Sequence, residues 1–234
     1  MAGMSEPRTI RYRAYGRSLL ETVGKFLSLS ADQRIALKTV SAVFPFKVNP
    51  YVLEHLIDWD DIPNDPIFQL TFPQAGMLEP RDFSFLSNLV IRGEDQSMAV
   101  EAQRVQLRMN PHPAGQMDLN IPVIVGESLP GAQHKYRETL LFFPSQGQTC
   151  HAYCTYCFRW AQFVGLDELK ISSRETDTLF RYIQAHPELS DLLLTGGDPL
   201  VMSSGILRRY IEPLLGQRTE HLKSIRIGTK ALSY

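Results

Sequence analysis

The sequence predicts an α/β fold, in which a helical region over residues 1–115 precedes a region over residues 116–234 where strands and helices alternate. Two observations carry this prediction. Up to about residue 110, apolar residues recur at helical spacing. From Glu138 onward, short apolar runs are separated by amphipathic helical stretches. With 234 residues and 44% hydrophobic content, the chain can bury a sizeable core.

Several helices are predicted in the first region, over residues 19–27, 31–43, 50–57 and 96–109. Ser30 and Gln33 form a capping box for the second of these helices. Pro50 suits the first position of the third helix, because proline there loses no hydrogen bond. The stretch 59–66 is rich in proline and aspartate and should break regular structure. A linker is expected over residues 110–115.

Three strands and two helices are predicted in the second region, with strands over 139–143, 191–195 and 224–228. The first strand is apolar enough to be buried on both faces. Ser172 with Glu175 is expected to cap the intervening helix, which His186-Pro187 stops. Strands that alternate with helices pair in parallel through right-handed crossovers. This is the opening of a (β/α) barrel, which takes ~250 residues when closed, so the chain is predicted to be a truncated, N-terminal portion of a longer enzyme.

The net charge and the apolar runs of the sequence bear on the partners and the cellular location to be expected. The formal net charge of −1 gives no electrostatic reason to expect nucleic acid or an anionic membrane surface as a partner. The first residues have no apolar signal segment, and no later run approaches the ~18 apolar residues of a membrane span. We therefore expect a cytoplasmic protein, in which thiols stay reduced.

The cysteines are the most informative residues. Cys150, Cys154 and Cys157 are the only cysteines of the chain, and they fall within one short loop after the first predicted strand. Three thiolates can hold three irons of a [4Fe–4S] cluster and leave the fourth iron open to an outside ligand. An open metal position is typical of catalytic rather than structural sites.

Two other interpretations of the cysteines stay open, whereas a disulfide framework is disfavoured by the odd count. A Cys3His zinc site could take His151 or His134 as its fourth ligand. However, His151 directly follows Cys150, and zinc sites usually pair two Cys-x-x-Cys knuckles. The third interpretation is a set of buried structural thiols.

A second motif, Gly196-Gly197-Asp198-Pro199, follows the second predicted strand. Since the carboxyl ends of parallel strands share one edge, this motif and the cysteine loop should be neighbours. Two glycines let the backbone approach a ligand closely. The structural alternative is that Asp198 is the N-cap and Pro199 the first residue of a helix.

The spacing Cys-x3-Cys-x2-Cys, with Tyr156 before the third cysteine, resembles the radical S-adenosylmethionine superfamily. Three further runs narrow the resemblance to the lysine 2,3-aminomutase family, and the match extends from about Leu29 onward. These runs are Lys-Val-Asn-Pro-Tyr at 47–51, Leu-Pro-Gly-Ala-Gln-His-Lys-Tyr at 129–136 and Leu-Thr-Gly-Gly-Asp-Pro-Leu at 194–200.

The resemblance implies a radical-SAM partial TIM barrel and a set of cofactors. Cys150, Cys154 and Cys157 would bind the cluster, whose open iron chelates S-adenosylmethionine. An electron from a donor such as flavodoxin or ferredoxin would then release a 5′-deoxyadenosyl radical. Tyr156 would lie beside the adenine. The residues implied to contact the methionine portion are Gly196, Gly197 and Asp198.

The resemblance also implies pyridoxal 5′-phosphate as a cofactor. The family carries an Arg-Tyr pair for it, matched here by Lys135 and Tyr136. Lysine keeps the charge but loses the bidentate fork of arginine, and Lys135 can also be interpreted as a solvated surface charge. The family's Schiff-base lysine lies in a glycine-rich segment that would follow Tyr234. Lys170, Lys223 and Lys230 occupy no comparable motif.

Arg159 matches the family's arginine that holds a substrate carboxylate, although a structural salt bridge is the alternative. The predicted activity is the migration of an amino group from C2 to C3 of lysine or a related amino acid. The rivals are a relative that acts on a protein lysine of a translation factor, and a truncated, non-catalytic metal-binding remnant. The helices of the first region could support a homo-oligomer.

Overall fold

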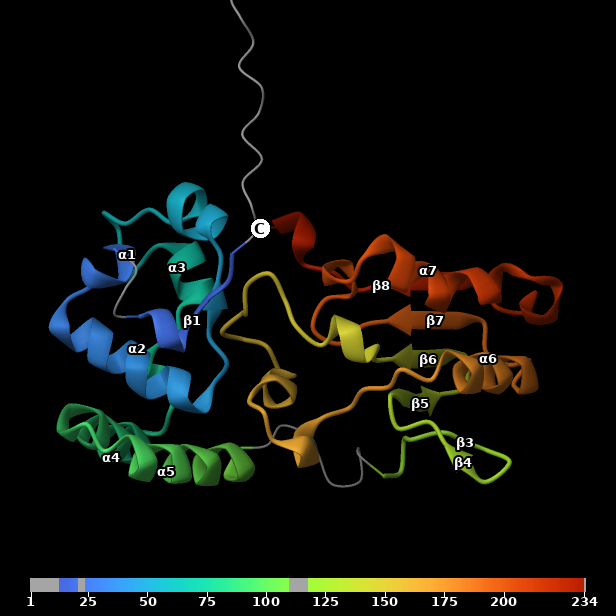
Figure 1. Cartoon of the computed structure of the whole chain (residues 1–234), viewed down its shortest axis with the longest axis horizontal. Helices are drawn as coiled ribbons and strands as arrows, with labels where there is room; N and C mark the ends of the chain where they lie inside the picture. Colours follow the sequence, from blue (N-terminus) through green and yellow to red (C-terminus); the bar gives the residue numbers. More distant parts are fainter. Residues whose placement is uncertain (1–12, 21–23, 110–117, 234) are drawn as a thin grey trace, which may run out of the picture.

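The computed structural model describes residues 13–20, 24–109 and 118–233 of the chain (Figure 1). Its α-helices are α1 (Gly24–Leu27), α2 (Ala31–Val43), α3 (Pro66–Thr71), α4 (Pro80–Arg92), α5 (Asp95–Arg108), α6 (Thr176–Ala185) and α7 (Ser204–Ile211). Its strands are β1 (Tyr15–Gly16), β2 (Lys47–Val48), β3 (Val123–Ile124), β4 (Glu127–Ser128), β5 (Ala132–Tyr136), β6 (Thr139–Phe142), β7 (Asp191–Leu194) and β8 (Ser224–Ile227). The α/β class predicted from the sequence is confirmed.

The main sheet has the strand order β5-β6-β7-β8. The strands β6, β7 and β8 pair in parallel, with Leu140 opposite Leu192 and Leu192 opposite Ile225. The helices α6 and α7 connect them, so the predicted alternation of strands and helices is confirmed. Strand β5, which was not predicted, adds antiparallel to β6. The described strands form open sheets and no closed barrel.

The core of the sheet half explains why these short runs form strands. Leu140 and Phe142 of β6 and Leu192 and Leu194 of β7 are fully buried and pack against α6 and α7. Their neighbours Leu141 and Leu193 are only half-buried. Successive side chains of a strand point to opposite faces, so the described elements bury one face more completely than the other. The prediction that β6 is buried on both faces is therefore wrong for the described residues.

The helical half begins as predicted. Ser30 and Gln33 form the expected capping box, since each side chain accepts a hydrogen bond from the other residue's amide, at 2.8 and 3.2 Å. The helix expected after Pro50 is present, but residues Val52–Leu56 wind as a π-helix. Helices α3 and α4 were not predicted, although Asp65 caps α3 by accepting a hydrogen bond from the amide of Phe68.

Two predictions about the ends of elements need comment. Helix α6 starts after Glu175, whose amide donates to Ser173 Oγ at 3.0 Å, so the predicted capping box with Ser172 is wrong. Ser173, one residue closer to the helix than Ser172, accepts the hydrogen bond from the Glu175 amide instead. The predicted linker over 110–115, and the domain boundary at 115/116, lie outside the described residues.

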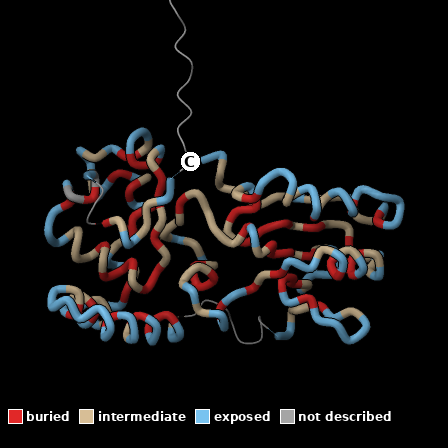
Figure 2. The backbone as a smooth tube through the Cα atoms, in the orientation of Figure 1, coloured by how far each residue is buried: buried red, intermediate tan, exposed pale blue. Residues whose placement is uncertain are grey.

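The segment after β6 joins the two halves. In Figure 1 it runs as a yellow and gold trace from the sheet toward the helices. Ala152 is buried with residues of α3 and its surroundings, whereas Trp160, Ala161 and Leu169 are buried with residues of α2, α4 and α5. Figure 2 shows buried stretches, in red, in both halves of the molecule. In the described part of the chain, no helix is long and apolar enough to cross a membrane.

Candidate metal and cofactor site

The cysteine loop starts where β6 ends, after a short 3-10 turn over Ser145–Gly147. None of the three cysteines forms a disulfide, and each is half-buried. Burial raises the pKa of the Cys150 thiol to about 12, and neighbouring negative charges, chiefly that of Cys157, add to the rise. Burial also raises the pKa of Cys157. Because burial disfavours the thiolate form, a bound cation is needed to hold these residues as thiolates at neutral pH.

The arrangement of the cysteines distinguishes the candidate metals. Within the described residues, no three or more His, Cys, Asp or Glu side chains are arranged to hold one metal ion. A [4Fe–4S] cluster has a different requirement, because each thiolate binds a different iron. Both ring nitrogens of His134 are engaged, with Tyr182 Oη at 2.6 Å and the Arg137 carbonyl at 3.3 Å. The donor set therefore fits a cluster better than a Cys3His zinc ion with His134.

The helical half holds the cysteine loop by its backbone. The amide of Tyr153 donates to the carbonyl of Lys47 at 2.9 Å, and the amide of Thr155 donates to the carbonyl of Leu70 at 2.8 Å. Asn49 Nδ2 donates to the carbonyl of His151 at 3.4 Å. These contacts fix the loop between its first and last cysteine.

The double-glycine bend packs against the start of the cysteine loop, as the positions of the strand ends predicted. A Cβ on Gly197 would lie 2.3 Å from the carbonyl oxygen of Thr149. Gly196 has a φ of +140°, and a Cβ there would lie 2.0 Å from Gln148 Nε2. Only glycine permits this contact at both positions, so the two motifs form one surface.

Asp198 is a structural hub in this arrangement. It is 1% exposed, and its carboxylate accepts hydrogen bonds from the amide of Leu200 at 2.9 Å and from Thr229 Oγ1 at 2.7 and 2.8 Å. The amides of Lys230 and Ala231 also donate to it, at 2.8 and 3.1 Å. The capping role proposed as the structural alternative is observed. Contact of this carboxylate with a cofactor stays a prediction.

The loop after β8 contributes Lys230, which the sequence analysis named only as a lysine outside any Schiff-base motif. The ammonium of Lys230 lies 5.4 Å from the centre of the Tyr156 ring. A hydrogen bond to Tyr156 is the main reason that the pKa of Lys230 is raised, and the charge of Cys154 adds to it. Tyr156 itself is 67% exposed. The loops after three neighbouring parallel strands thus meet at the cysteines.

Arg159 lies on the sheet side of the loop. Its guanidinium donates to Thr195 Oγ1, and its centre lies 4.8 Å from the ring centre of Phe143 and 5.1 Å from that of Phe158. Burial lowers its pKa. Among the described residues no carboxylate pairs with Arg159, so the structural salt bridge considered from the sequence is not formed.

Lys135 and Tyr136 lie at the other end of the sheet. Tyr136 pairs with Thr139, the first residue of β6, whereas the cysteine loop follows Phe142, about 10 Å away along the strand. Both residues are exposed, and the Lys135 ammonium lies 5.7 Å from the centre of the Tyr136 ring. The structure does not bring this pair to the cysteines. The exposure of Lys135 agrees with the alternative interpretation of this residue as a solvated surface charge.

Gln148 was also missed by the sequence analysis. Its Nε2 donates to the carbonyl of Pro144 at 3.0 Å, but its buried Oε1 has no hydrogen-bond partner. Buried acceptors without a partner are rare and often mark a ligand position. This one belongs to the side chain that touches Gly196, so it fits a ligand that offers a hydrogen-bond donor beside the double-glycine bend.

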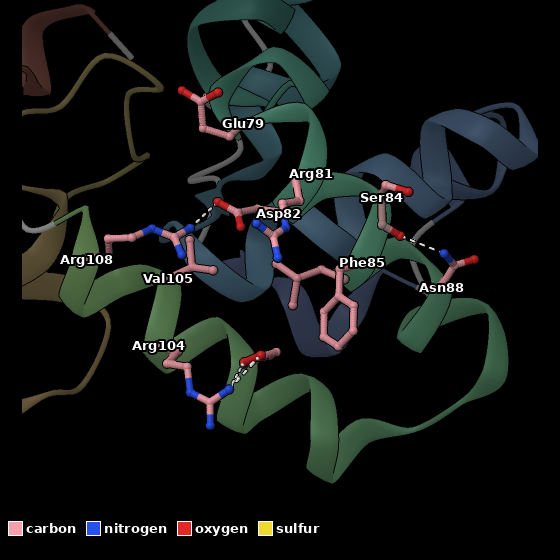
Figure 3. A pocket seen from close by; sticks show the side chains of 11 residues that line it. Glu79, Arg81, Asp82, Ser84, Phe85, Asn88, Arg104, Val105 and Arg108 are labelled. Atoms are coloured by element: carbon pink, nitrogen blue, oxygen red, sulfur yellow. Dashed lines mark hydrogen bonds and ion pairs between the residues drawn. The ribbon is translucent and has the colours of Figure 1, made fainter.

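A hollow of about 780 Å³ lies between α4 and α5, away from the cysteines (Figure 3). None of its lining residues belongs to the candidate site. Ion pairs of Arg104 with Glu101 and of Arg108 with Asp82 lie along it.

The fold and the site together define an α/β protein that gathers three cysteines at the carboxyl ends of parallel strands. The chain is similar over most of its length to several L-lysine 2,3-aminomutases. It is 29% identical over 211 residues to a putative L-lysine 2,3-aminomutase of Aquifex aeolicus, covering 89% of this chain and 45% of that protein. It is 28% identical over 204 residues to L-lysine 2,3-aminomutase of Bacillus subtilis, covering 74% of this chain and 41% of that protein.

A shorter match, 32% identical over 102 residues, relates 44% of this chain to 28% of the Escherichia coli L-lysine 2,3-aminomutase. The chain therefore spans less than half the length of these relatives. No family model matches the sequence.

Proposed function

We propose that this protein is a radical S-adenosylmethionine enzyme of the aminomutase type. The observation that carries the proposal is the contact between a loop of three half-buried cysteines and a double-glycine bend, both at the carboxyl ends of parallel strands. When bound, the [4Fe–4S] cluster supplies the electron that cleaves S-adenosylmethionine to a 5′-deoxyadenosyl radical. The three strands are then the first strands of a partial (β/α) barrel.

The residues of the chain have separate tasks in this proposal. Cys150, Cys154 and Cys157 bind three irons and lose their protons as the cluster forms. The backbone of the double-glycine bend and Gln148 Oε1 hold the amino-acid end of S-adenosylmethionine. Carbonyl and amide oxygens accept hydrogen bonds from an ammonium, and a buried acceptor gains most from such a partner. The exposed ring of Tyr156 offers a surface on which adenine can stack.

Arg159 is proposed to hold the carboxylate of the amino-acid substrate. Its guanidinium is half-buried between two aromatic rings and has a neutral partner in Thr195. A fixed, partly desolvated guanidinium binds a carboxylate more strongly than a solvated one. The proposed reaction moves the amino group of lysine or a related amino acid from C2 to C3.

Pyridoxal 5′-phosphate is a further cofactor of this proposal, and it is carried by the resemblance alone. Lys135 and Tyr136 lie beside the start of strand β6, whereas the cysteines follow its end. The electron donor, of the flavodoxin or ferredoxin class, and a homo-oligomeric state are further parts of the proposal.

Anaerobic reconstitution tests the proposal. The purified chain is incubated with iron and sulfide, and its electron paramagnetic resonance spectrum is recorded after reduction, with and without S-adenosylmethionine. We expect a [4Fe–4S]⁺ signal that changes when S-adenosylmethionine binds, and formation of 5′-deoxyadenosine. The Cys154→Ser variant should lose the signal. Stoichiometric zinc with no iron uptake would instead favour a non-catalytic metal-binding module.

A further inference from the structure

Lys47 reaches into the cysteine loop from strand β2. Its ammonium donates hydrogen bonds to Thr149 Oγ1 and, at 3.2 Å, to the carbonyl of Cys150. The same ammonium lies 5.1 Å from the centre of the Tyr153 ring. The carbonyl of Lys47 accepts a hydrogen bond from the amide of Tyr153 at 2.9 Å. One residue of the helical half thus holds the loop on both sides of its first cysteine.

The environment of the Lys47 ammonium points to a ligand with negative charge. The residue is half-buried, and among the described residues no carboxylate pairs with it. A partly buried ammonium is destabilised unless an opposite charge lies close by. Burial lowers the pKa of Lys47, and the charge of Cys150 opposes this shift. In the sequence, this lysine showed only as the first residue of the run 47–51.

We propose that Lys47 is a positioning residue that fixes the cysteine loop and supplies the positive charge that stabilises the reduced [4Fe–4S] cluster. This inference rests on the proposed function. Reduction adds one negative charge to the cluster and its thiolates. A nearby cation therefore stabilises the reduced form more than the oxidised form and raises the reduction potential. The same hydrogen bonds hold Cys150 in place, which slows loss of iron.

Two variants test the role of the Lys47 ammonium. Lys47→Met keeps the length of the side chain and removes both the charge and the donors, whereas Lys47→Arg keeps the charge. The matched control is Lys223→Met. Lys223 is exposed and donates a hydrogen bond to the carbonyl of Glu220. It precedes β8, so it lies at the end of the parallel strands that is opposite to the cysteines. Each reconstituted protein is titrated with reductant while the [4Fe–4S]⁺ resonance is recorded, and iron release to a chelator is timed.

The expected result is a shift of the Lys47→Met midpoint to more negative potential, with iron release about tenfold faster, as is usual when a residue that orients metal ligands is lost. Lys47→Arg should retain the wild-type potential, and Lys223→Met should match the wild type in both measurements. Equal potentials and equal release rates in the wild type and Lys47→Met would overturn the inference alone. A wild-type chain that takes up no cluster would overturn the proposed function together with the inference.

Discussion

The amide of Asp198 donates a 2.7 Å hydrogen bond to the carbonyl of Thr149, the residue that precedes the first cysteine. The loops after β6 and β7 are therefore joined at the backbone. The carboxylate of the same aspartate receives donors from the loop after β8. One residue, through its amide and its carboxylate, thus sets the relative positions of three loops, and any ligand bound at the cysteines depends on it.

Replacing Asp198 by Asn should destabilise the fold. The amide nitrogen of Asn would face donors from Thr229, Lys230 and Ala231, and the charge that strengthens these bonds would be lost. Removing a buried, charged acceptor of this kind costs about 3 kcal/mol. Urea unfolding of the chain checks this. Asp167→Asn is the control, since Asp167 is exposed and, among the described residues, its side chain pairs only with Lys170. An unchanged urea midpoint for Asp198→Asn would show that the hub is dispensable.

Gly197→Ala should displace the cysteine loop. The new Cβ would collide with the backbone of Thr149, which cannot rotate away as a side chain could. We expect the variant to fold but to bind substantially less iron after reconstitution, measured per mole of protein. Gly205→Ala is the matched control, because a Cβ there meets nothing within 4 Å. Alanine within helix α7 should leave iron binding unchanged and stabilise the fold by about 0.5–1 kcal/mol. Full iron content in Gly197→Ala would contradict the proposed contact.

Much of this arrangement could be predicted, and the gaps have physical causes. The parallel strands followed from short apolar runs, and their order placed the cysteines beside the double-glycine bend. The hub role of Asp198 could not be predicted, because its donors at residues 229–231 are distant in the chain. The position of Lys135 and Tyr136 was missed because β5 has no clear apolar alternation.

The metal-free protein should lose stability as the pH rises above the ordinary thiol range. Burial raises the pKa of Cys150 to about 12 in the folded state, whereas an unfolded thiol has a pKa of about 8.5. Between these values the unfolded chain releases a proton that the folded chain retains, so alkali favours unfolding. The full stability is present below the unfolded pKa. Urea midpoints measured without metal from pH 7 to pH 10.5 should fall more steeply in the wild type than in Cys150→Ala. Parallel curves for the two proteins would contradict the buried thiol.

Gln148→Leu should weaken binding of S-adenosylmethionine to the reconstituted protein. The orphan Oε1 of Gln148 lies buried beside Gly196, where the amino-acid end of the cofactor is proposed to bind. A hydrogen bond from an ammonium to a buried acceptor contributes about 1.5 kcal/mol, so the Kd should rise roughly tenfold. Leucine has nearly the same volume, and it removes an acceptor that has no protein partner. The variant should therefore keep its urea midpoint to within the effect of the lost bond to Pro144. Gln184→Leu, on helix α6, serves as control. Unaltered affinity in Gln148→Leu, measured by calorimetry under anaerobic conditions, would show that the cofactor binds without this acceptor.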